Sequence, residues 1–460
     1  MAAGSQRTAL VGVACAVPLD GGPAMRTDVD ILVEGGCITG IGTGIAAGWH
    51  ADIRIDGARR LAMPGLVNAH THSPENLVRG IGDGLPLDRW LARVWRRLDA
   101  LTPEQIRVAV LLGAAEMLRG GCTAVLDHFR QTPVRAEGVE AAVAAYEEIG
   151  LRAVVAVMVR DALDGDGRLV GAPWAAPVPA ATILDLCAAA ARNRASTGTL
   201  VRVGVAPSGP LRATDDLLAG AAALGRRLGV PLHIHVDETE AEAREARERS
   251  GRSAISRLHE LGFLSPGTSL AHCVWVGPED VACIAAAGSV VVHNPVSNLR
   301  LGAGVMPLTA MRKAGARVAV GTDGAASNDA QSVLEAAKLA AFLPRIDEPD
   351  AHAWPSCAEI AAMAIAGGAH AMGLEPGRLQ PGARADVALF DLDDPVLAPL
   401  NRPLEQLVLG GASVRASTVL VDGRVVLRDG RLTRVDEGRL YAEARSLGME
   451  DALAATGGAA

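Results

Sequence analysis

The segment PGLVNAHTH contains two histidines, His70 and His72, at the end of an apolar run. Residues at i and i+2 of a β-strand point to the same side, so both imidazoles can reach one metal ion. Paired histidines also occur as ordinary interior or surface residues, so this spacing alone is a weak signal. A metal site needs support from residues elsewhere in the chain.

Three further apolar runs end in side chains that can bind a metal or move a proton. They are HIHVDET with His233, His235 and Glu238, SLAHCVWV with His272, and VAVGTDG with Asp323. Three neutral imidazoles and one carboxylate suit zinc or iron and leave a position open for water. Any one of these residues taken singly fits a hydrogen-bonded interior position. Their recurrence at successive strand ends favours a metal site.

The region that carries these residues has the pattern of a parallel barrel. From about Leu61 to Leu374, short apolar runs alternate with longer alanine-rich stretches, which is typical of βα units. The eight candidate strands are Met63 to Asn68, Ala124 to Asp127, Ala153 to Val157, Val201 to Ala206, Leu232 to Val236, Ser269 to His272, Val290 to His293 and Val318 to Gly321. Catalytic groups of such barrels come from the C-terminal ends of the strands. We therefore expect an α/β fold with a (β/α)8 TIM-like barrel over residues 61–374.

Both ends of the chain carry short, glycine-punctuated apolar alternations that indicate strands. The Asp-Gly pairs at Asp422 and Asp429 are typical of hairpin turns. We expect a small β-sandwich formed by residues 1–60 and 375–460, the second segment ending in a C-terminal tail. The apolar stretch from Ala9 to Val17 resembles a short secretory signal, but it fits a first β-strand equally well.

Composition excludes several classes of protein. The chain has 460 residues, of which 49% are hydrophobic and 21% charged, so it can bury a large core. Its net charge of −8 is spread over interspersed acidic and basic residues, which argues against a nucleic-acid partner. No apolar run approaches the ~20 residues of a membrane span. Seven scattered cysteines without a CxxC pair favour a reducing cytoplasm.

The motifs PGLVNAHTH, HIHVDET, AHCVWV, VVHNPVSNLRLGAG and GTDGAASND together resemble the amidohydrolase superfamily. The resemblance covers essentially the whole chain and points to the ATZ/TRZ branch, with its adenosylhomocysteine, methylthioadenosine, guanine and 8-oxoguanine deaminases and its triazine hydrolases. It implies four metal ligands, namely His70, His72, His235 and Asp323. It also implies that Glu238 is the proton shuttle and that His272 hydrogen-bonds the attacking or attacked oxygen.

The number of metal ions follows from a missing residue. Binuclear members of this superfamily commonly bridge their metals with a carboxylated lysine from the fourth strand, but lysine occurs here only at Lys313 and Lys338. We expect one divalent ion per chain, zinc with Fe2+ as the alternative. The bound cation would generate hydroxide that attacks an sp² carbon. Glu238 would pass the proton to the leaving nitrogen, while Asp323 holds the water and His272 stabilises the intermediate.

Two departures from the nucleoside deaminases bear on the substrate. Trp90 stands where adenosine-type members carry a tryptophan near the substrate. Those enzymes place a glutamate for the ribose soon afterwards, where this chain offers Leu98 or Asp99, and a histidine after the fourth strand, where it offers Ser208. Both departures weaken the nucleoside hypothesis.

The segment GCTAVLDHFRQ, with His128, looks more like the 8-oxoguanine deaminase and hydroxyatrazine hydrolase group, which acts on free heterocycles. We expect Trp90, His128, Ser208 and Arg160 to bind the substrate, although each also fits a structural role. Our leading hypothesis is an aminohydrolase that releases ammonia from a purine, pterin, pyrimidine or triazine free base.

Three alternatives stay open. The chain could deaminate adenosylhomocysteine or methylthioadenosine, or it could be a hydrolytic dechlorinase or cyclic amide hydrolase acting through the same site. A barrel kept as a binding or scaffold protein would have lost a metal ligand or Glu238, and none is lost. A homo-oligomer is compatible with all of these functions.

Overall fold

Eight parallel strands form a barrel at the centre of the molecule. The computed structural model describes residues 6–19, 21, 25–195 and 200–456. In order around the barrel the strands are β6 (Leu66–Thr71), β7 (Cys122–Phe129), β8 (Arg152–Val159), β9 (Val201–Pro207), β10 (Leu232–Val236), β11 (Thr268–His272), β12 (Val290–His293) and β13 (Arg317–Val320). The sheet closes where the backbone N–H groups of Thr322 and Asp323 donate to the carbonyl of His70. The expected α/β barrel is confirmed.

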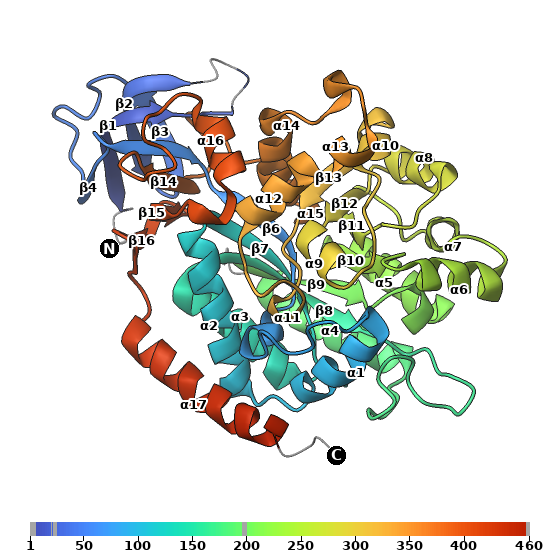
Figure 1. Ribbon diagram of the computed structural model, residues 1–460. Helices are drawn as coiled ribbons and strands as arrows, with labels where there is room; N and C mark the ends of the chain where they lie inside the picture. Colours follow the sequence, from blue (N-terminus) through green and yellow to red (C-terminus); the bar gives the residue numbers. More distant parts are fainter. Residues whose placement is uncertain (1–5, 20, 22–24, 196–199, 457–460) are drawn as a thin grey trace.

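Helices cover the outside of the barrel, as Figure 1 shows. The longer ones are α1 (Leu87–Leu98), α2 (Pro103–Arg119), α3 (Ala136–Ile149), α4 (Ala180–Ala195), α5 (Asp215–Leu228), α6 (Glu240–Ser250), α8 (Pro278–Ala287), α12 (Val333–Phe342) and α17 (Glu437–Thr456). Shorter helices near the site are η1 (Ser73–Leu77), η2 (Pro210–Arg212), α9 (Pro295–Arg300) and α11 (Ala325–Asn328). The remaining α-helices are α7 (Ala254–Glu260), α10 (Leu308–Lys313), α13 (Pro344–Asp347), α14 (Cys357–Ala362), α15 (Gly368–Ala371) and α16 (Pro403–Gly410).

The first expected barrel strand, Met63 to Asn68, overlaps β6 but begins too early, in a strand of the other sheet. This apolar run contains two strands in different sheets: β5 (Arg60–Pro64) pairs with β1 and β14 of the outer sheet, and β6 begins at Leu66. Gly65 separates them, and a Cβ atom there would lie 2.1 Å from the Thr123 side chain. The chain therefore crosses from one sheet to the other at a position where only glycine fits. The other seven expected strands coincide with or overlap the observed ones.

Both ends of the chain build a second β-structure, a nine-stranded sheet, as expected. Its strands are β1 (Arg7–Ala16), β2 (Arg26–Glu34), β3 (Cys37–Gly42), β4 (Ile53–Asp56), β5, β14 (Val387–Asp391), β15 (Ala416–Val421), β16 (Arg424–Arg428) and β17 (Arg431–Leu432). The hairpin turns at Asp422 and Asp429 are confirmed, because both residues have positive φ and join antiparallel strands. Figure 1 shows the blue N-terminal strands beside the orange-red C-terminal ones.

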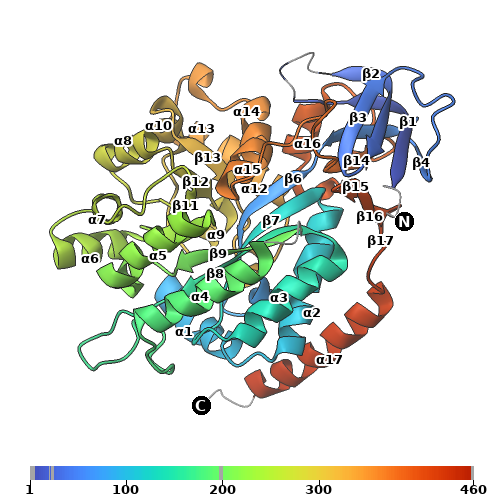
Figure 2. The same cartoon turned by 180° about the vertical axis from the view of Figure 1, so that it is seen from behind.

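The C-terminal helix α17 returns to the barrel and lies along α2, as both Figure 1 and Figure 2 show. Arg119 of α2 pairs with Glu437 at 2.9 Å and donates to the hydroxyl of Tyr441 at 3.0 Å.

Within the described residues, no helix is long and apolar enough to cross a membrane.

Candidate active site

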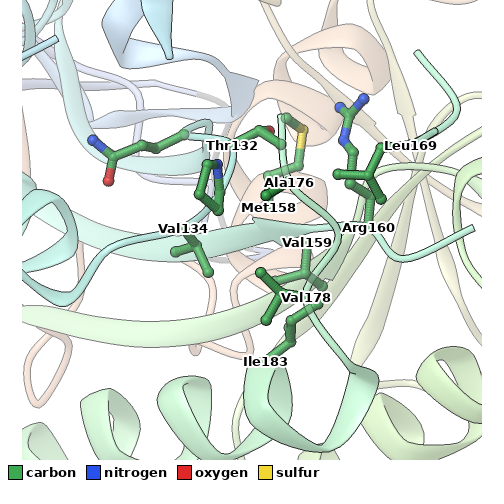
Figure 3. A pocket seen from close by; sticks show the side chains of 11 residues that line it. Thr132, Val134, Met158, Val159, Arg160, Leu169, Ala176, Val178 and Ile183 are labelled. Carbon is green, nitrogen blue, oxygen red and sulfur yellow. The ribbon is translucent and has the colours of Figure 1, made fainter. Parts of the chain in front are cut away.

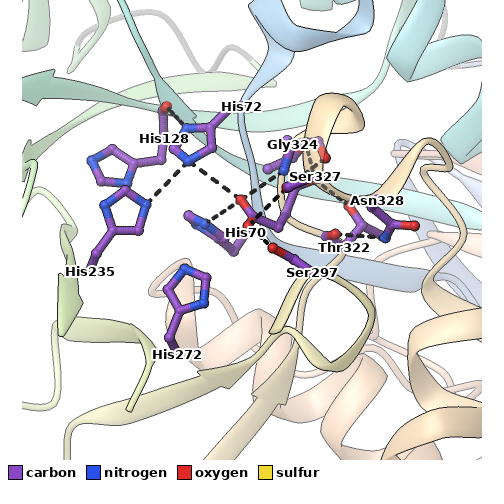
Figure 4. A network of polar contacts seen from close by, with 12 residues as sticks. His70, His72, His128, His235, His272, Ser297, Thr322, Gly324, Ser327 and Asn328 are labelled. Atoms are coloured by element: carbon purple, nitrogen blue, oxygen red, sulfur yellow. Dashed lines mark hydrogen bonds and ion pairs between the residues drawn. The ribbon is translucent and has the colours of Figure 1, made fainter. Parts of the chain in front are cut away.

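The four side chains expected to bind a metal come together at the C-terminal end of the barrel strands, and Figure 4 shows the three histidines among them. His70 Nε2 lies 3.1 Å from Asp323 Oδ1, and His72 Nε2 lies 3.5 Å from the same oxygen. His72 Nε2 and His235 Nε2 are 3.2 Å apart. All four residues are buried.

Hydrogen bonds at Nδ1 orient the rings of His72 and His235 so that their Nε2 atoms face the other expected metal ligands. His72 Nδ1 donates to the carbonyl of His128 at 2.7 Å, and His235 Nδ1 donates to the carbonyl of Ser208 at 2.6 Å. A carbonyl can only accept, so both protons lie on Nδ1 and both Nε2 atoms present lone pairs. Burial lowers the pKa of His72 to about 3 and that of His235 well below its ordinary value, so both rings are neutral.

His70 is held by a longer chain of hydrogen bonds. Its Nδ1 lies 2.8 Å from His233 Nε2, His233 Nδ1 lies 2.7 Å from Ser269 Oγ, and that hydroxyl donates to the carbonyl of Leu232. The serine oxygen therefore accepts from His233, whose Nε2 accepts from His70. This arrangement leaves His70 Nε2 without a proton.

The donor set fits a divalent cation. Buried His70 Nε2 has no hydrogen-bond partner, and it faces the carboxylate of Asp323. The lone pairs of His72 and His235 likewise face each other at 3.2 Å. Such groups repel unless a positive charge lies between them, and imidazole nitrogens with a carboxylate oxygen are ligands that zinc and iron prefer. A bound cation would relieve these contacts.

Asp323 is positioned by the loop that follows β13. Its φ is +61°, in the left-handed region that aspartate tolerates better than most residues. Oδ1 accepts from the backbone N–H of Gly324 at 2.7 Å, and Oδ2 accepts from the hydroxyls of Ser297 at 2.6 Å and Ser327 at 3.1 Å. Donors from three sides fix the carboxylate next to the imidazoles.

Glu238 and His272 lie on one side of this cluster. His272 Nε2 is 3.8 Å from Glu238 Oε2, and His272 Nδ1 lies 2.9 Å from Asn298 Oδ1, which accepts from it. Burial raises the pKa of Glu238 to about 7. A carboxyl with such a pKa can take up and release a proton near neutral pH, which suits a general acid-base group.

A narrow cavity opens onto these residues. His72, His235, Glu238, His272 and Asp323 form its polar end. The remaining lining side chains are apolar ones, Leu87, Trp90, Leu91, Trp95 and Leu301, together with Glu75 and Arg212. Trp90, which was expected to bind the substrate, lines this cavity. Its indole N–H donates to the carbonyl of Ala326 at 3.2 Å.

The other three residues expected to bind substrate lie around this cavity and not among those that line it. The His128 ring packs 4.4 Å from the His235 ring, and its Nε2 contacts the carbonyl of Ala206 at 3.3 Å. Ser208 Oγ accepts from Arg160 Nη2 at 3.0 Å. Arg160 lines a neighbouring cavity of about 290 Å³ with apolar residues such as Met158 and Ile183 (Figure 3). Their binding roles stay predictions.

Asp99, which stands near the position of a ribose-binding glutamate, is fully engaged. Its Oδ2 accepts from Arg130 at 3.0 Å and from the indole of Trp174 at 2.8 Å, and its Oδ1 accepts from the backbone of Thr132 at 2.8 Å. The carboxylate therefore holds the β7 and β8 loops together and has partners on both oxygens.

Two charged residues of the cavity were missed from the sequence. Glu75 lies on η1, three residues after His72, and Arg212 lies on η2 after β9, paired with Glu242. The position of Glu75 directly after the HxH pair was the only available signal. A glutamate in a short polar segment is ordinarily a solvated residue.

The family follows from a comparison with known proteins. A model described as "Amidohydrolase family" matches residues 61–426. This chain belongs to the amidohydrolase family. This amidohydrolase is an enzyme, a hydrolase of C–N bonds other than peptide bonds, since its curated relatives are deaminases.

Two of the curated relatives are 35% identical to this amidohydrolase. One is a 5'-deoxyadenosine deaminase of Methanothermobacter thermautotrophicus, aligned over 91% of this chain and 93% of the relative. The other is a 5-methylthioadenosine/S-adenosylhomocysteine deaminase of Desulforudis audaxviator, aligned over 90% and 93%.

Solved structures resemble the whole chain. A variant of the atrazine chlorohydrolase TrzN from Arthrobacter aurescens, complexed with zinc and atraton, has a TM-score of 0.88 at 26% identity over 96% of this chain and 99% of TrzN. An adenosine deaminase from Xanthomonas campestris with bound zinc has a TM-score of 0.84 at 28% identity over 96% and 97%. Together with the His and Asp cluster, these relatives establish a divalent-metal site in this amidohydrolase.

Proposed function

We propose that this amidohydrolase is a zinc-dependent aminohydrolase with one ion per chain, and that it releases ammonia from an aminated free heterocycle. The observation that carries the proposal is the cavity itself. His72, His235, Asp323 and the buried Glu238 line it beside apolar side chains, and His70 Nε2 lies 3.1 Å from the Asp323 carboxylate.

His70, His72, His235 and Asp323 would hold the ion. A bound zinc ion supplies a Lewis acid that lowers the pKa of water toward neutrality. The deeper ring atoms, His70 Nδ1 and His233 Nε2, lie 2.8 Å apart and hydrogen-bond to each other, which supports a single ion. β9 also contains no lysine that could bridge two metal ions, which supports a single ion.

Glu238 takes a proton from the attacking water at Oε2 and returns it to the departing nitrogen. Its buried position, with a pKa raised to about 7, lets it do both near neutral pH. His272 is held by Asn298 so that Nε2 points toward Glu238, and it hydrogen-bonds the oxygen at the reacting carbon. Trp90 and Trp95 stack on the ring and exclude bulk water.

A nucleoside deaminase is the second candidate, and the names of the curated relatives favour it. Recognition of a ribose needs polar groups with free hydrogen-bonding capacity. Asp99 has partners on both oxygens, and Ser208 accepts from Arg160. A free base therefore fits this site better than a nucleoside does.

Ammonia release from zinc-loaded protein tests the proposal. The panel contains guanine, 8-oxoguanine, isocytosine, pterin and an aminotriazine against adenosine, methylthioadenosine and adenosylhomocysteine. Turnover of a free base and not of the nucleosides supports the proposal. Turnover of nucleosides alone would favour the second candidate. Chloride release from a chlorotriazine without any ammonia release would instead identify a dechlorinase.

The cellular setting is part of the proposal. The seven cysteines are all free, which supports a reducing cytoplasm. A homo-oligomer remains a prediction.

A further inference from the structure

The expected catalytic groups are closed off from solvent. His72, His235, Glu238, His272 and Asp323 are each no more than 7% exposed, and the cavity that they line is narrow. A heterocycle reaches them only if part of the wall moves. The strand ends are held by the hydrogen bonds of the barrel, so the moving part must be another element that lines the cavity.

Helix α1 forms much of the wall that does not come from the strands. Four of its side chains line the cavity, namely Leu87, Trp90, Leu91 and Trp95. Its buried side belongs to a small hydrophobic cluster that is separate from the barrel core. The buried members of that cluster from other segments are Val78, Met158, Leu301 and Ala326. A helix that packs on such a small cluster can move while the barrel core stays intact.

The segment that carries the first three of these side chains is fixed at both ends. Before it, the backbone N–H of Gly80 donates to the carboxylate of Asp329. After it, the carbonyl of Trp95 accepts from Arg130 at 2.9 Å, and the same arginine donates to Asp99 at 3.0 Å. Any movement of α1 is therefore confined to residues 81–94.

Residues 81–94 themselves are tethered by one hydrogen bond. The indole N–H of Trp90 donates to the carbonyl of Ala326 on α11 at 3.2 Å. Within the part of the chain that the structure describes, no other hydrogen bond and no ion pair joins residues 81–94 to a segment outside residues 78–99. The position of this segment depends on that bond and on apolar packing.

The loop before α1 has the glycines that a hinge needs. Gly80, Gly82 and Gly84 have φ values of +72°, +87° and +71°. Glycine adopts positive and negative φ about equally well, so this loop can change its conformation at little cost. A Cβ atom at Gly82 would lie 2.8 Å from Cδ1 of Trp90, so the loop packs directly on this tryptophan.

We propose that residues 81–94 form a lid over the active site, and that the indole of Trp90 is the latch that holds the lid closed. Opening breaks the hydrogen bond to Ala326 and moves Leu87, Trp90 and Leu91 out of the wall, so that substrate enters and product leaves. Closing restores the bond and excludes bulk water. The lid carries none of the four expected metal ligands, so it controls access to the metal site and not the metal affinity.

Rates of zinc exchange test the lid. Zinc removal by excess dipicolinate and zinc uptake by metal-depleted protein are followed by stopped flow in the wild type and in Trp90→Phe, which keeps an aromatic ring but lacks the N–H donor. Loss of one neutral hydrogen bond should make the open lid about fivefold more populated. We expect removal and uptake both to become about fivefold faster and the zinc affinity to stay the same, because a lid gates both directions equally.

Two results would overturn the lid. One is unchanged rates in Trp90→Phe, and the other is faster removal without faster uptake, which is the sign of a weakened metal site. Trp354→Phe is the matched control, because the indole N–H of Trp354 donates to the carbonyl of Glu348 at 2.7 Å, away from α1. Both rates should keep their wild-type values in this control.

A second variant keeps the test decisive if Trp90→Phe does not fold. Gly82→Ala places a methyl group against the Trp90 ring at a φ that alanine disfavours, so it should also speed removal and uptake together. Gly229→Ala, at the end of α5, has a φ of +64° and no atom within 4 Å of its Cβ, and it should change neither rate. Equal rates in these two variants would contradict the lid.

The lid and the proposed function fail in different experiments. Zinc exchange involves no turnover, so the lid does not depend on which heterocycle is the substrate. No ammonia release from any aminated ring would overturn the proposed function and leave the result for the lid unchanged.

Discussion

Each of the three imidazoles expected to bind the metal is oriented by a hydrogen-bond partner that is not itself a metal ligand. The carbonyls of His128 and Ser208 hold two of the rings, and His233 with Ser269 holds the third. Such partners fix the tautomer that presents a lone pair, and their loss typically lowers metal affinity by about 10- to 100-fold. The arrangement at His70 is the most vulnerable because it depends on two side chains.

Ser269→Ala should lower zinc affinity about 10-fold, since His233 would lose its acceptor and could no longer hold the proton on His70 Nδ1. Competition with a chromogenic chelator measures this affinity. Ser417→Ala is the matched control, because its hydroxyl bonds a carbonyl in the outer sheet. Unchanged affinity in Ser269→Ala would contradict the role of the chain of hydrogen bonds.

Glu238→Gln should keep its zinc content and lose at least about 100-fold in kcat, because the amide cannot carry a proton. Elemental analysis and steady-state ammonia release measure the two quantities. Normal turnover would show that another group moves the proton.

The sequence predicted that His70, His72, His235 and Asp323 lie together, because they follow apolar runs and strand ends meet at one end of a parallel barrel. The sequence did not reveal Glu75 as a residue of the cavity, because the burial of its side chain depends on contacts with α11 and the tryptophans of α1. Arg160 and Ser208 show the opposite limit. Both lie close to the site, but they are bonded to each other, and no sequence pattern reveals such pairing.

Among the strands and helices, Asp127 links three elements, namely β7, η1 and α3. It lies near the end of β7, and its oxygens accept from the backbone of Ser73 on η1 and from the hydroxyl of Tyr146 on α3. Burial raises the pKa of Asp127 from 3.8 to about 6. The folded chain therefore binds this proton more tightly than the unfolded chain does. The resulting stability is fully present below pH 3.8 and is lost as the pH rises through about 6.

Asp127→Asn should remove this pH dependence. The wild type should lose stability relative to the variant as the pH rises. The free energy of unfolding of the variant minus that of the wild type should increase by roughly 1 kcal/mol between pH 5 and pH 7.5. Urea unfolding of both proteins with the same zinc loading gives this difference. A difference that does not change with pH would mean that Asp127 titrates normally in the folded chain.

Element boundaries show why part of the fold could not be predicted. One strand was expected from Met63 to Asn68, although the Pro64-Gly65 pair inside it is a turn signal, and Gly65 lets the chain pass from the outer sheet into the barrel. Burial on both sides of the crossing removes the alternation that would mark it. The hairpins at Asp422 and Asp429 were predictable because Asp-Gly turns are local.

Across the whole molecule, the barrel is fastened to the outer sheet by Arg152. This residue begins β8, and its buried guanidinium contacts Asp386 at 3.1 Å and Asp422 at 3.2 Å. Arg384 also reaches Asp422, but its side chain is 57% exposed. The two arginines allow a buried and an exposed ion pair to be compared at one carboxylate.

Arg152→Met should destabilise the protein by about 3 kcal/mol, because two partly buried carboxylates would lose their shared cation. Arg384→Met should cost less than about 1 kcal/mol. Chemical denaturation measures both. Equal, small losses would show that Arg152 does not fasten the two parts.

A zinc titration of metal-depleted protein tests the central claim most directly. Ammonia release from the best free base of the panel is measured after each addition, with Glu238→Gln as the blank. We expect activity to rise in proportion to zinc and to reach its plateau at one ion per chain. A plateau at two ions per chain, or full activity without added metal, would contradict a single-metal aminohydrolase.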